Sequence, residues 1–237
     1  MNYNYGSTSR NQNSFCISWN EFERFVICDL SCDPLQVAGW LGSQSKTQYK
    51  LSQLIKATPG LRMPGCWEGF ELAVRAILGQ QITVKAATTL AGRIASAFGK
   101  KLKSSPFDEL HALRPTPKDL IDADLENHGV ISSRANAIRQ LAKAVHAGEI
   151  CFNSAIASTE LCRRLCEIKG IGQWTADYIS TRALQEPDAF PSSDLVLRKN
   201  ASLNGTLITA KQLSTLAEPW RACAAMYLWS ANQEHKK

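Results

Sequence analysis

The sequence predicts an all-α protein, and three observations lead to that prediction. Apolar residues recur at helical spacing in several separate stretches, whereas the alternation typical of half-buried strands is scarce. Apolar residues make up 44% of the 237 residues, which is enough to form a substantial core. Breaks rich in Pro, Asp and Ser separate the helical stretches, at residues 105–106, 115–117, 187–188 and 191–192.

The elements follow one another along the chain. Residues 1–14 are polar and aperiodic, so we expect a flexible tail before one domain over residues 15–237. Residues 25–28 are consistent with a short strand or with a helix end. Gly99 and Gly148 are positioned to end the second and third of four helices. The core-facing stripes of these helices are Phe70, Ala73, Val74, Ile77 and Leu78; Val84, Ala87, Ala91, Ile94 and Phe98; Ile131, Ala135, Ile138, Leu141, Ala142 and Val145; and Trp220, Cys223, Ala224, Tyr227 and Leu228.

Charge and cysteine content narrow the class of protein. The chain carries 27 Lys and Arg against 21 Asp and Glu, and a net charge of +6 permits a polyanionic partner without demonstrating one. The 8 cysteines show neither the C-x₂-C spacing of zinc sites nor a run suited to an iron–sulfur cluster, and we expect no metal or other cofactor. No secretory signal or transmembrane run is visible, so we expect reduced thiols in a cytoplasmic protein that does not enter a membrane.

The most informative motif is a helical hairpin, which we predict over residues 159–184. An apolar helix end runs into Gly170-Ile-Gly172, and a second helix starts at once. Glycines let the backbone approach a partner closely, and the first amides of the second helix favour a phosphate. Lys169 adds a positive charge beside the turn. The motif is suited to holding a DNA strand without reading its sequence, although Gly-x-Gly can also simply join two packed helices.

A single carboxylate follows the hairpin. Asp194 lies 22 residues after Gly172, within Phe-Pro-Ser-Ser-Asp and at the predicted start of another helix. An Asp at such a position is commonly a helix N-cap. Capping fixes the side chain and leaves one oxygen free, and a nearby carboxylate stabilises the cationic state of glycosidic cleavage. We therefore favour a catalytic role for Asp194 over a purely structural one.

Together these motifs resemble the helix-hairpin-helix superfamily of DNA glycosylases, and within it most closely the 3-methyladenine DNA glycosylase II type. Supporting stretches lie at residues 61–81, 133–138, 190–195 and 217–220, and the likeness runs over most of the chain. The resemblance implies two helical subdomains that flank a DNA-binding cleft. It also implies that the mixed α/β N-terminal domain of bacterial relatives is truncated or absent, because few residues precede Pro59.

The resemblance implies an activity in base excision repair. An alkylated purine, such as 3-methyladenine or 7-methylguanine, is flipped out of double-stranded DNA, and its N-glycosidic bond is hydrolysed with Asp194 as the catalytic residue. Relatives with lyase activity carry Lys where this chain has Trp174, so we expect a monofunctional enzyme that leaves an abasic site. A glycosylase for other damaged or deaminated bases, and a non-catalytic DNA-binding hairpin, remain the alternatives.

The resemblance also assigns the remaining site residues. Trp174, Tyr178 and Trp220 match the aromatic base pocket, where electron-rich rings favour a cationic base, although ordinary core packing is an alternative. Gln81 matches the residue that fills the space left by the flipped base, or else it begins the next helix. Arg134 is a candidate contact to the DNA backbone or an ordinary surface residue.

The implied partner is damaged double-stranded DNA, and we expect the protein to act as a monomer. Leu195, directly after Asp194, departs from relatives with an aromatic residue there, which leaves the range of accepted bases open. Carbonyls of such a hairpin can coordinate a monovalent cation, but nothing in the sequence requires one.

Overall fold

The computed structural model describes residues 46–58, 61, 63–103, 112–152, 156–203, 206–215, 218 and 221–231. Within these ranges the regular elements are helical, and two isolated bridges, Lys101–Ala112 and Leu203–Thr206, are the only β-type pairings. The all-α prediction is confirmed for this part of the chain. The predicted tail, residues 25–28 and the expected lack of an N-terminal α/β domain concern residues outside these ranges.

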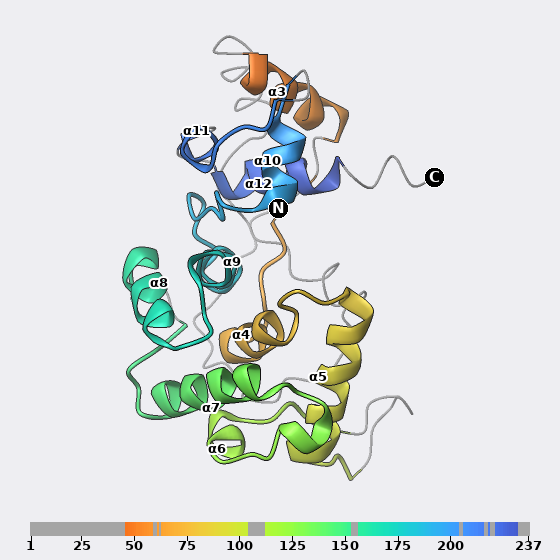
Figure 1. Ribbon diagram of the computed structural model, residues 1–237, viewed down its shortest axis with the longest axis vertical. Coiled ribbons are helices and arrows are strands. Elements are labelled where there is room, and N and C mark those ends of the chain that lie inside the picture. Colours follow the sequence, from red (N-terminus) through yellow and green to blue (C-terminus); the bar gives the residue numbers. More distant parts are fainter. Residues whose placement is uncertain are drawn as a thin grey trace, which may run out of the picture.

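The described helices form two groups, which lie at opposite ends of the long axis (Figure 1). The larger group runs from α4 to α9, and the smaller one combines α3 with α10, α11 and α12. Their bounds are α3 Lys46–Ala57, α4 Gly69–Leu78, α5 Val84–Phe98, α6 Pro117–Leu120, the 3₁₀ turn η1 Glu126–His128, α7 Ser132–His146, α8 Ser158–Glu167, α9 Gln173–Ala183, α10 Leu195–Ala201, α11 Ala210–Ser214 and α12 Arg221–Ser230.

Helix α4 is the centre of the larger group and packs against α5, α7 and α9. All five residues of its predicted stripe are buried, as are the four residues from Ala135 to Ala142 that the α7 stripe contains. Each fully buried aliphatic or aromatic side chain contributes about 1.5–3 kcal/mol by leaving water. The apolar stripes of α4 and α7 therefore form the main core of this group.

A second core joins helices from both ends of the described chain. Leu51 and Ile55 of α3 meet Leu197 of α10 and Tyr227 of α12, and all four side chains are buried. The hydroxyl of Tyr227 donates a hydrogen bond to the carbonyl oxygen of Leu61 at 3.3 Å. Two separate cores confirm the expected pair of helical subdomains.

The stripe predicted for α5 is only partly buried. Ile94 is 2% exposed, whereas Val84 is 61% exposed and the start of the helix is largely accessible. The prediction was wrong for this end of α5 because the helix reaches beyond the core, and Val84 and Ala87 line a pocket instead. Ile131 is likewise exposed, since it occupies the N-cap position just before α7.

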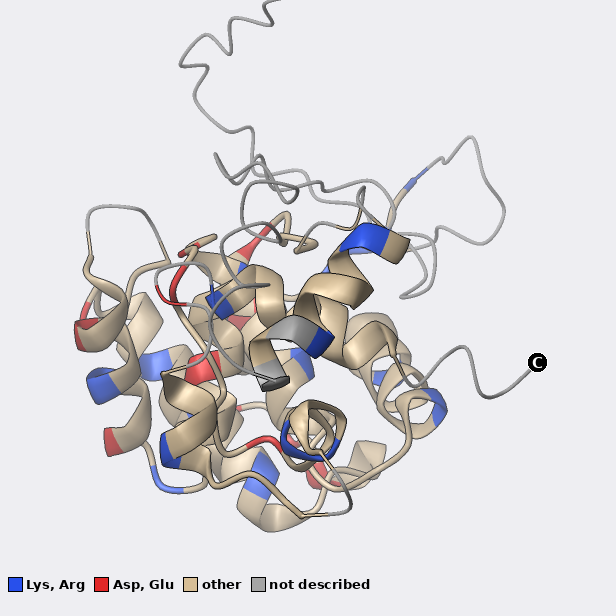
Figure 2. Ribbon diagram, turned by 90° about the horizontal axis from the view of Figure 1, so that it is seen from above, with Lys and Arg blue, Asp and Glu red and all other residues tan. Residues whose placement is uncertain are grey.

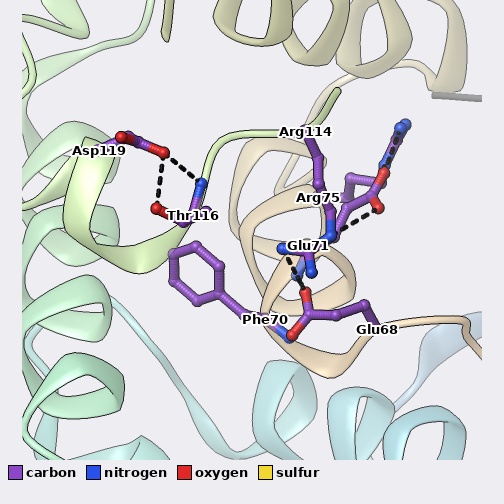
Figure 3. Close-up of polar contacts among 7 residues, drawn as sticks. All are labelled: Glu68, Phe70, Glu71, Arg75, Arg114, Thr116 and Asp119. Atoms are coloured by element: carbon purple, nitrogen blue, oxygen red, sulfur yellow. Dashed lines mark hydrogen bonds and ion pairs between the residues drawn. The ribbon is translucent and has the colours of Figure 1, made fainter. Parts of the chain in front are cut away.

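Polar contacts fix the start of α4 (Figure 3). The Glu68 carboxylate caps the helix by accepting hydrogen bonds from the amides of Phe70 at 3.1 Å and Glu71 at 2.7 Å. Arg114 lies 3.2 Å from Glu68, and Glu71 pairs with Arg75 one turn later at 2.7 Å. These contacts hold the helix that leads directly into Gln80 and Gln81.

Candidate active site

The hairpin consists of α8, the turn around Gly170 and Gly172, and α9. Gly170 has φ +103°, which an L side chain rarely adopts, and a Cβ there would lie 3.2 Å from the Cβ of Ala137 on α7. Ile171 is buried and anchors the turn in the core, while Gly172 is exposed. The predicted hairpin is confirmed, and its second glycine faces solvent at the start of α9.

The first turn of α9 lacks a side-chain cap, since Gly172 occupies the N-cap position. The amides at a helix start have no partner within the helix, and together with the helix dipole they attract an anion. Lys169 is exposed on the same turn. In the view of Figure 2, basic and acidic residues both occur along the described helices.

Asp194 is the N-cap of α10 and is only 8% exposed. Its Oδ1 accepts a hydrogen bond from the amide of Leu197 at 2.8 Å. Its Oδ2 accepts one from the indole Nε1 of Trp174 at 2.8 Å. The fold thus brings the end of the Phe-Pro-Ser-Ser-Asp loop against the hairpin and fixes both oxygens, each of which retains a further acceptor site.

Aromatic rings extend away from this carboxylate. Trp174 and Tyr178 are stacked, with ring centroids 5.6 Å apart and an angle of 11° between their planes. The Tyr178 hydroxyl accepts a hydrogen bond from Nη1 of Arg182 at 2.8 Å. Trp174 is 37% exposed, so its second face is accessible to a ligand. Trp220, the third aromatic residue expected here, lies outside the described residues.

Trp229 is an aromatic neighbour that sequence reasoning missed. Its ring meets Tyr178 edge-on, with centroids 6.4 Å apart and planes at 65°. It comes from the last turn of α12, so the contact joins the two subdomains at the site. The available signal was a tryptophan two residues after Tyr227, just outside the apolar stripe of that helix.

A pocket of about 180 Å³ adjoins Trp174 and Tyr178. Its other walls come from the end of α4 and the start of α5, and include Ala76, Ile82 and Val84. Pockets for drug-sized ligands begin at roughly 300 Å³, so this smaller one suits one planar ring system, such as a pair of fused rings. A larger hollow of about 1200 Å³ lies between α7 and α8, but neither Asp194 nor an aromatic ring lines it.

The loop between α4 and α5 reaches across to the hairpin. Gln81 is exposed and has φ +55°. The side-chain amide of Gln80 donates hydrogen bonds to the carbonyl oxygen of Gly170 at 3.0 Å and to Oγ1 of Thr175 at 3.1 Å. Arg134 donates to the carbonyl oxygen of Gln80, so its observed partner is this loop.

The described ranges contain no cluster of three or more His, Cys, Asp or Glu side chains able to hold a metal ion. The described cysteines are free thiols, and burial raises the pKa of Cys162 to about 12, helped by the neighbouring Asp177. None of the described helices combines the length and apolar character needed to cross a membrane.

Sequence comparison identifies close relatives of the chain. DNA-3-methyladenine glycosylase 2 of Escherichia coli is 35% identical over 207 residues, which cover 85% of this chain and 67% of that protein. A probable bifunctional transcriptional activator/DNA repair enzyme AlkA of Mycobacterium tuberculosis is 31% identical over 207 residues, and the match covers 86% of this chain and 41% of the relative.

Solved structures share the fold. A DNA-3-methyladenine glycosidase from Bacillus halodurans matches with a TM-score of 0.68 at 25% identity, over 87% of this chain and 92% of that one. The Schizosaccharomyces pombe 3-methyladenine DNA glycosylase in complex with abasic DNA matches with a TM-score of 0.67 at 24% identity, over 84% and 97%.

A family model described as the HhH-GPD superfamily base excision DNA repair protein matches residues 74–222. This range includes the second half of α4, the loop that carries Gln81, the hairpin and Asp194. The chain therefore belongs to the HhH-GPD superfamily of base excision DNA repair proteins.

Proposed function

We propose that the protein is a monofunctional DNA glycosylase that removes alkylated purines from damaged double-stranded DNA and leaves an abasic site. The observation that supports the proposal is the hydrogen bond between Asp194 and Trp174, because Trp174 in turn lines the aromatic pocket. The named activities of the relatives from Escherichia coli and Bacillus halodurans support the same substrate class.

DNA binding is assigned to the hairpin and the loop before α5. A backbone phosphate would accept hydrogen bonds from the amides after Gly172, with Lys169 providing a further positive charge. Gln81 would enter the space left by the flipped nucleotide, because it is exposed at the tip of the loop. Neither contact reads the base sequence. A repair enzyme requires this, because lesions occur in any sequence.

The pocket favours a flat cationic base. The stacked rings of Trp174 and Tyr178 offer a π-face, and Ala76, Ile82 and Val84 provide apolar walls. Arg75 also lines the pocket, and its guanidinium is paired with the Glu71 carboxylate at 2.7 Å. An alkylated purine such as 7-methylguanine carries a positive charge, which is attracted to the face of an indole or phenol ring. An unmodified purine is neutral and gains less from the same contact.

The reaction requires one water molecule. The electron pair of the N-glycosidic bond leaves with the cationic base and neutralises it, while positive charge develops on the sugar. Asp194 stabilises this charge and orients the water whose oxygen bonds to C1′, and the released proton passes to the carboxylate or to solvent. No metal or other cofactor enters the scheme, because water is the only co-reactant that hydrolysis needs.

Trp174 also underlies the proposal that the enzyme has no lyase activity. A lyase needs an amine beside the acid, to attack the sugar and form a Schiff base. Here an indole occupies that position, 2.8 Å from Asp194, and Lys169 lies on the exposed tip of the turn instead. We expect no covalent complex when borohydride is added during turnover, and a trapped complex would contradict this part of the proposal.

The deciding experiment measures release of 3-methyladenine and 7-methylguanine from methylated duplex DNA. The wild-type protein should release both bases, and Asp194→Asn should not. Asn is as good an N-cap as Asp, so α10 should remain folded. The exposed acid Asp122, changed to Asn, serves as the control. Full activity in Asp194→Asn would refute the catalytic role, and release of neither methylated base by the wild-type protein would refute the substrate class.

A further inference from the structure

Three segments of the larger subdomain meet at Gln80. Its side-chain amide bridges the carbonyl oxygen of Gly170 in the hairpin and the hydroxyl of Thr175 in α9, at 3.0 and 3.1 Å. Its own carbonyl oxygen accepts a hydrogen bond from Arg134 near the start of α7. One residue of the α4–α5 loop is therefore bound to the hairpin through its side chain and to α7 through its backbone.

The next residue, Gln81, is held in an unfavourable backbone conformation. Its φ of +55° lies in the left-handed region, which costs a residue with a Cβ roughly 1–2 kcal/mol. Such a conformation persists only when the surrounding contacts determine it. The turn is closed by one backbone hydrogen bond, from the amide of Ile82 to the carbonyl oxygen of Gly79 at 3.4 Å. The contacts of Gln80 are the ones that connect this turn to the hairpin and to α7.

The hairpin end of this connection is also rigid. Gly170 packs so closely on α7 that an added Cβ would meet Ala137 at 3.2 Å and the backbone oxygen of Ser133 at 3.6 Å. Thr175, the second partner of Gln80, is 4% exposed. The bridge thus connects an exposed loop tip to a buried and tightly packed part of the fold.

We propose that Gln80 and Arg134 are positioning residues that hold the Gln81 turn at a fixed distance from the phosphate-binding hairpin. The inference rests on the proposed function, because it gives Gln81 its wedge role. A duplex fixes the spacing between a backbone phosphate and the neighbouring base stack. If the two contacts are made by one rigid unit, the wedge enters the stack as soon as the phosphate is bound, without ordering a loop first.

This assignment gives Arg134 a different role from a phosphate contact. Arg134 is half-buried, and its guanidinium donates a hydrogen bond to the Gln80 carbonyl oxygen, so it holds the loop against α7. A phosphate contact would contribute equally to damaged and undamaged DNA. A support for the wedge contributes where a base must be extruded from a stack, and contributes nothing where the base is already unpaired.

The test compares two substrates and five proteins. Release of 7-methylguanine is measured under single-turnover conditions from methylated duplex DNA and from methylated single strands. The proteins are the wild type, Gln80→Ala, Arg134→Met, Arg134→Lys and the control Gln53→Ala, which changes an exposed glutamine of α3. A separate arm follows the fluorescence of 2-aminopurine as it is extruded from an unmethylated duplex.

We expect Gln80→Ala and Arg134→Met to slow release from duplex DNA about tenfold, the effect of losing one or two hydrogen bonds, with the single-strand rate unchanged. Arg134→Lys, which keeps a donor, should recover most of the duplex rate. The rise in 2-aminopurine fluorescence should fall in the same two variants. Equal losses on both substrates, or none on either, would overturn the proposal.

The two proposals fail in different ways. If the wild-type protein releases no alkylated base from either substrate, the proposed activity is wrong, and the fluorescence arm still tests the positioning role. If the wild type is active but Gln80→Ala behaves like Gln53→Ala in both arms, the activity stands and the positioning role is wrong.

Discussion

Helices α9 and α10 meet at the site, since the first turn of α9 carries Trp174 and the N-cap of α10 is its partner Asp194. The two helix starts nevertheless differ in their chemistry. Helix α9 begins at Gly172, which has no side chain to cap it. Helix α10 begins at Asp194, whose Oδ1 caps the amide of Leu197 at 2.8 Å.

The difference shows how neighbouring helix ends are used for two tasks. A capping side chain stabilises a helix by about 1 kcal/mol relative to Ala and by roughly a few tenths relative to Gly, and α9, which begins at Gly172, lacks that contribution. Its amides are left available for an external anion, which supports the proposed phosphate site. At α10 the cap is present, and the second oxygen of the same carboxylate accepts the hydrogen bond from the indole of Trp174. The following predictions concern these two helix starts and the residues next to the start of α9.

The largest effect is expected at the capped end. Asp194→Asn and Asp194→Ala should both lower single-turnover base release by at least about 100-fold, because each removes the charge that stabilises the sugar cation. Only Ala should also remove the cap, with a loss of about 1 kcal/mol in the free energy of unfolding. Chemical denaturation separates the two variants, and equal stability would show that Asp194 does not cap α10 in solution.

At the uncapped start of α9, adding a capping side chain should make the protein more stable but weaken its binding to DNA. A Cβ at Gly172 would meet nothing within 4 Å, so Gly172→Asp fits without a clash. It should stabilise α9 by roughly a few tenths of a kcal/mol and weaken binding to undamaged duplex DNA about tenfold, since the new carboxylate repels a phosphate. Binding is measured by fluorescence anisotropy at one fixed salt concentration.

The neutral variant Gly172→Ser is the matched control for that experiment. It offers a cap without a charge, so it should gain similar stability and lose less DNA affinity than Gly172→Asp. If Gly172→Asp binds DNA as tightly as the wild type, the start of α9 is not the phosphate site.

Within the turn that precedes α9, we expect an effect on stability rather than on DNA binding. Gly170→Ala should lower the free energy of unfolding by about 1–3 kcal/mol, because φ is +103° and the new methyl group approaches Ala137 at 3.2 Å. Gly148→Ala is the comparison, since its φ is +76° but nothing lies within 4 Å. Urea unfolding should give the larger loss for Gly170, and equal losses would mean that packing on α7 contributes nothing.

The smallest effect concerns Asp177, one turn into α9. Burial raises the pKa of this carboxyl, against the opposing hydrogen bond from Gln173 at 2.8 Å. A raised pKa means that the folded state favours the protonated acid, so stability is greatest below the unfolded value and falls as pH rises through the folded one. Asp177→Asn should therefore increase the free energy of unfolding at pH 7 by less than about 1 kcal/mol, which a small rise in melting temperature would report.

The pH dependence is the check on that prediction. The advantage of Asp177→Asn over the wild type should shrink as pH falls below the ordinary Asp range near about 4, where the wild-type acid is protonated in both states. A stability difference that stays constant between pH 3 and pH 7 would show that the ionisation of Asp177 is not responsible.

Local patterns predicted much of the fold. The stripes of α4 and α7 and the hairpin glycines are short-range signals, because helical periodicity and turn conformation depend on neighbours in sequence. The same reasoning failed for Val84, whose apolar side chain lines the pocket rather than the core. Periodicity identifies an apolar face, but it cannot distinguish a core from a ligand site.

The site was less predictable because its key contacts are long-range. Asp194 was identified from the family pattern, but its bond to Trp174 spans 20 residues and appears only once the helices are packed. The bridge from Gln80 to Gly170 spans 90 residues. Trp229 was missed for the same reason, since no sequence pattern places the last helix beside α9.

One consequence concerns how such an enzyme changes its range of lesions. Trp174 is at once a wall of the pocket and the donor that holds Asp194. A smaller residue at position 174 would admit bulkier bases but would release the carboxylate from its fixed orientation. If Asp194 acts as proposed, we expect such a substitution to lower the rate on every substrate. Substitutions in the α4 and α5 walls of the pocket, at Ala76 or Val84, would change its size and leave the bond between Trp174 and Asp194 in place.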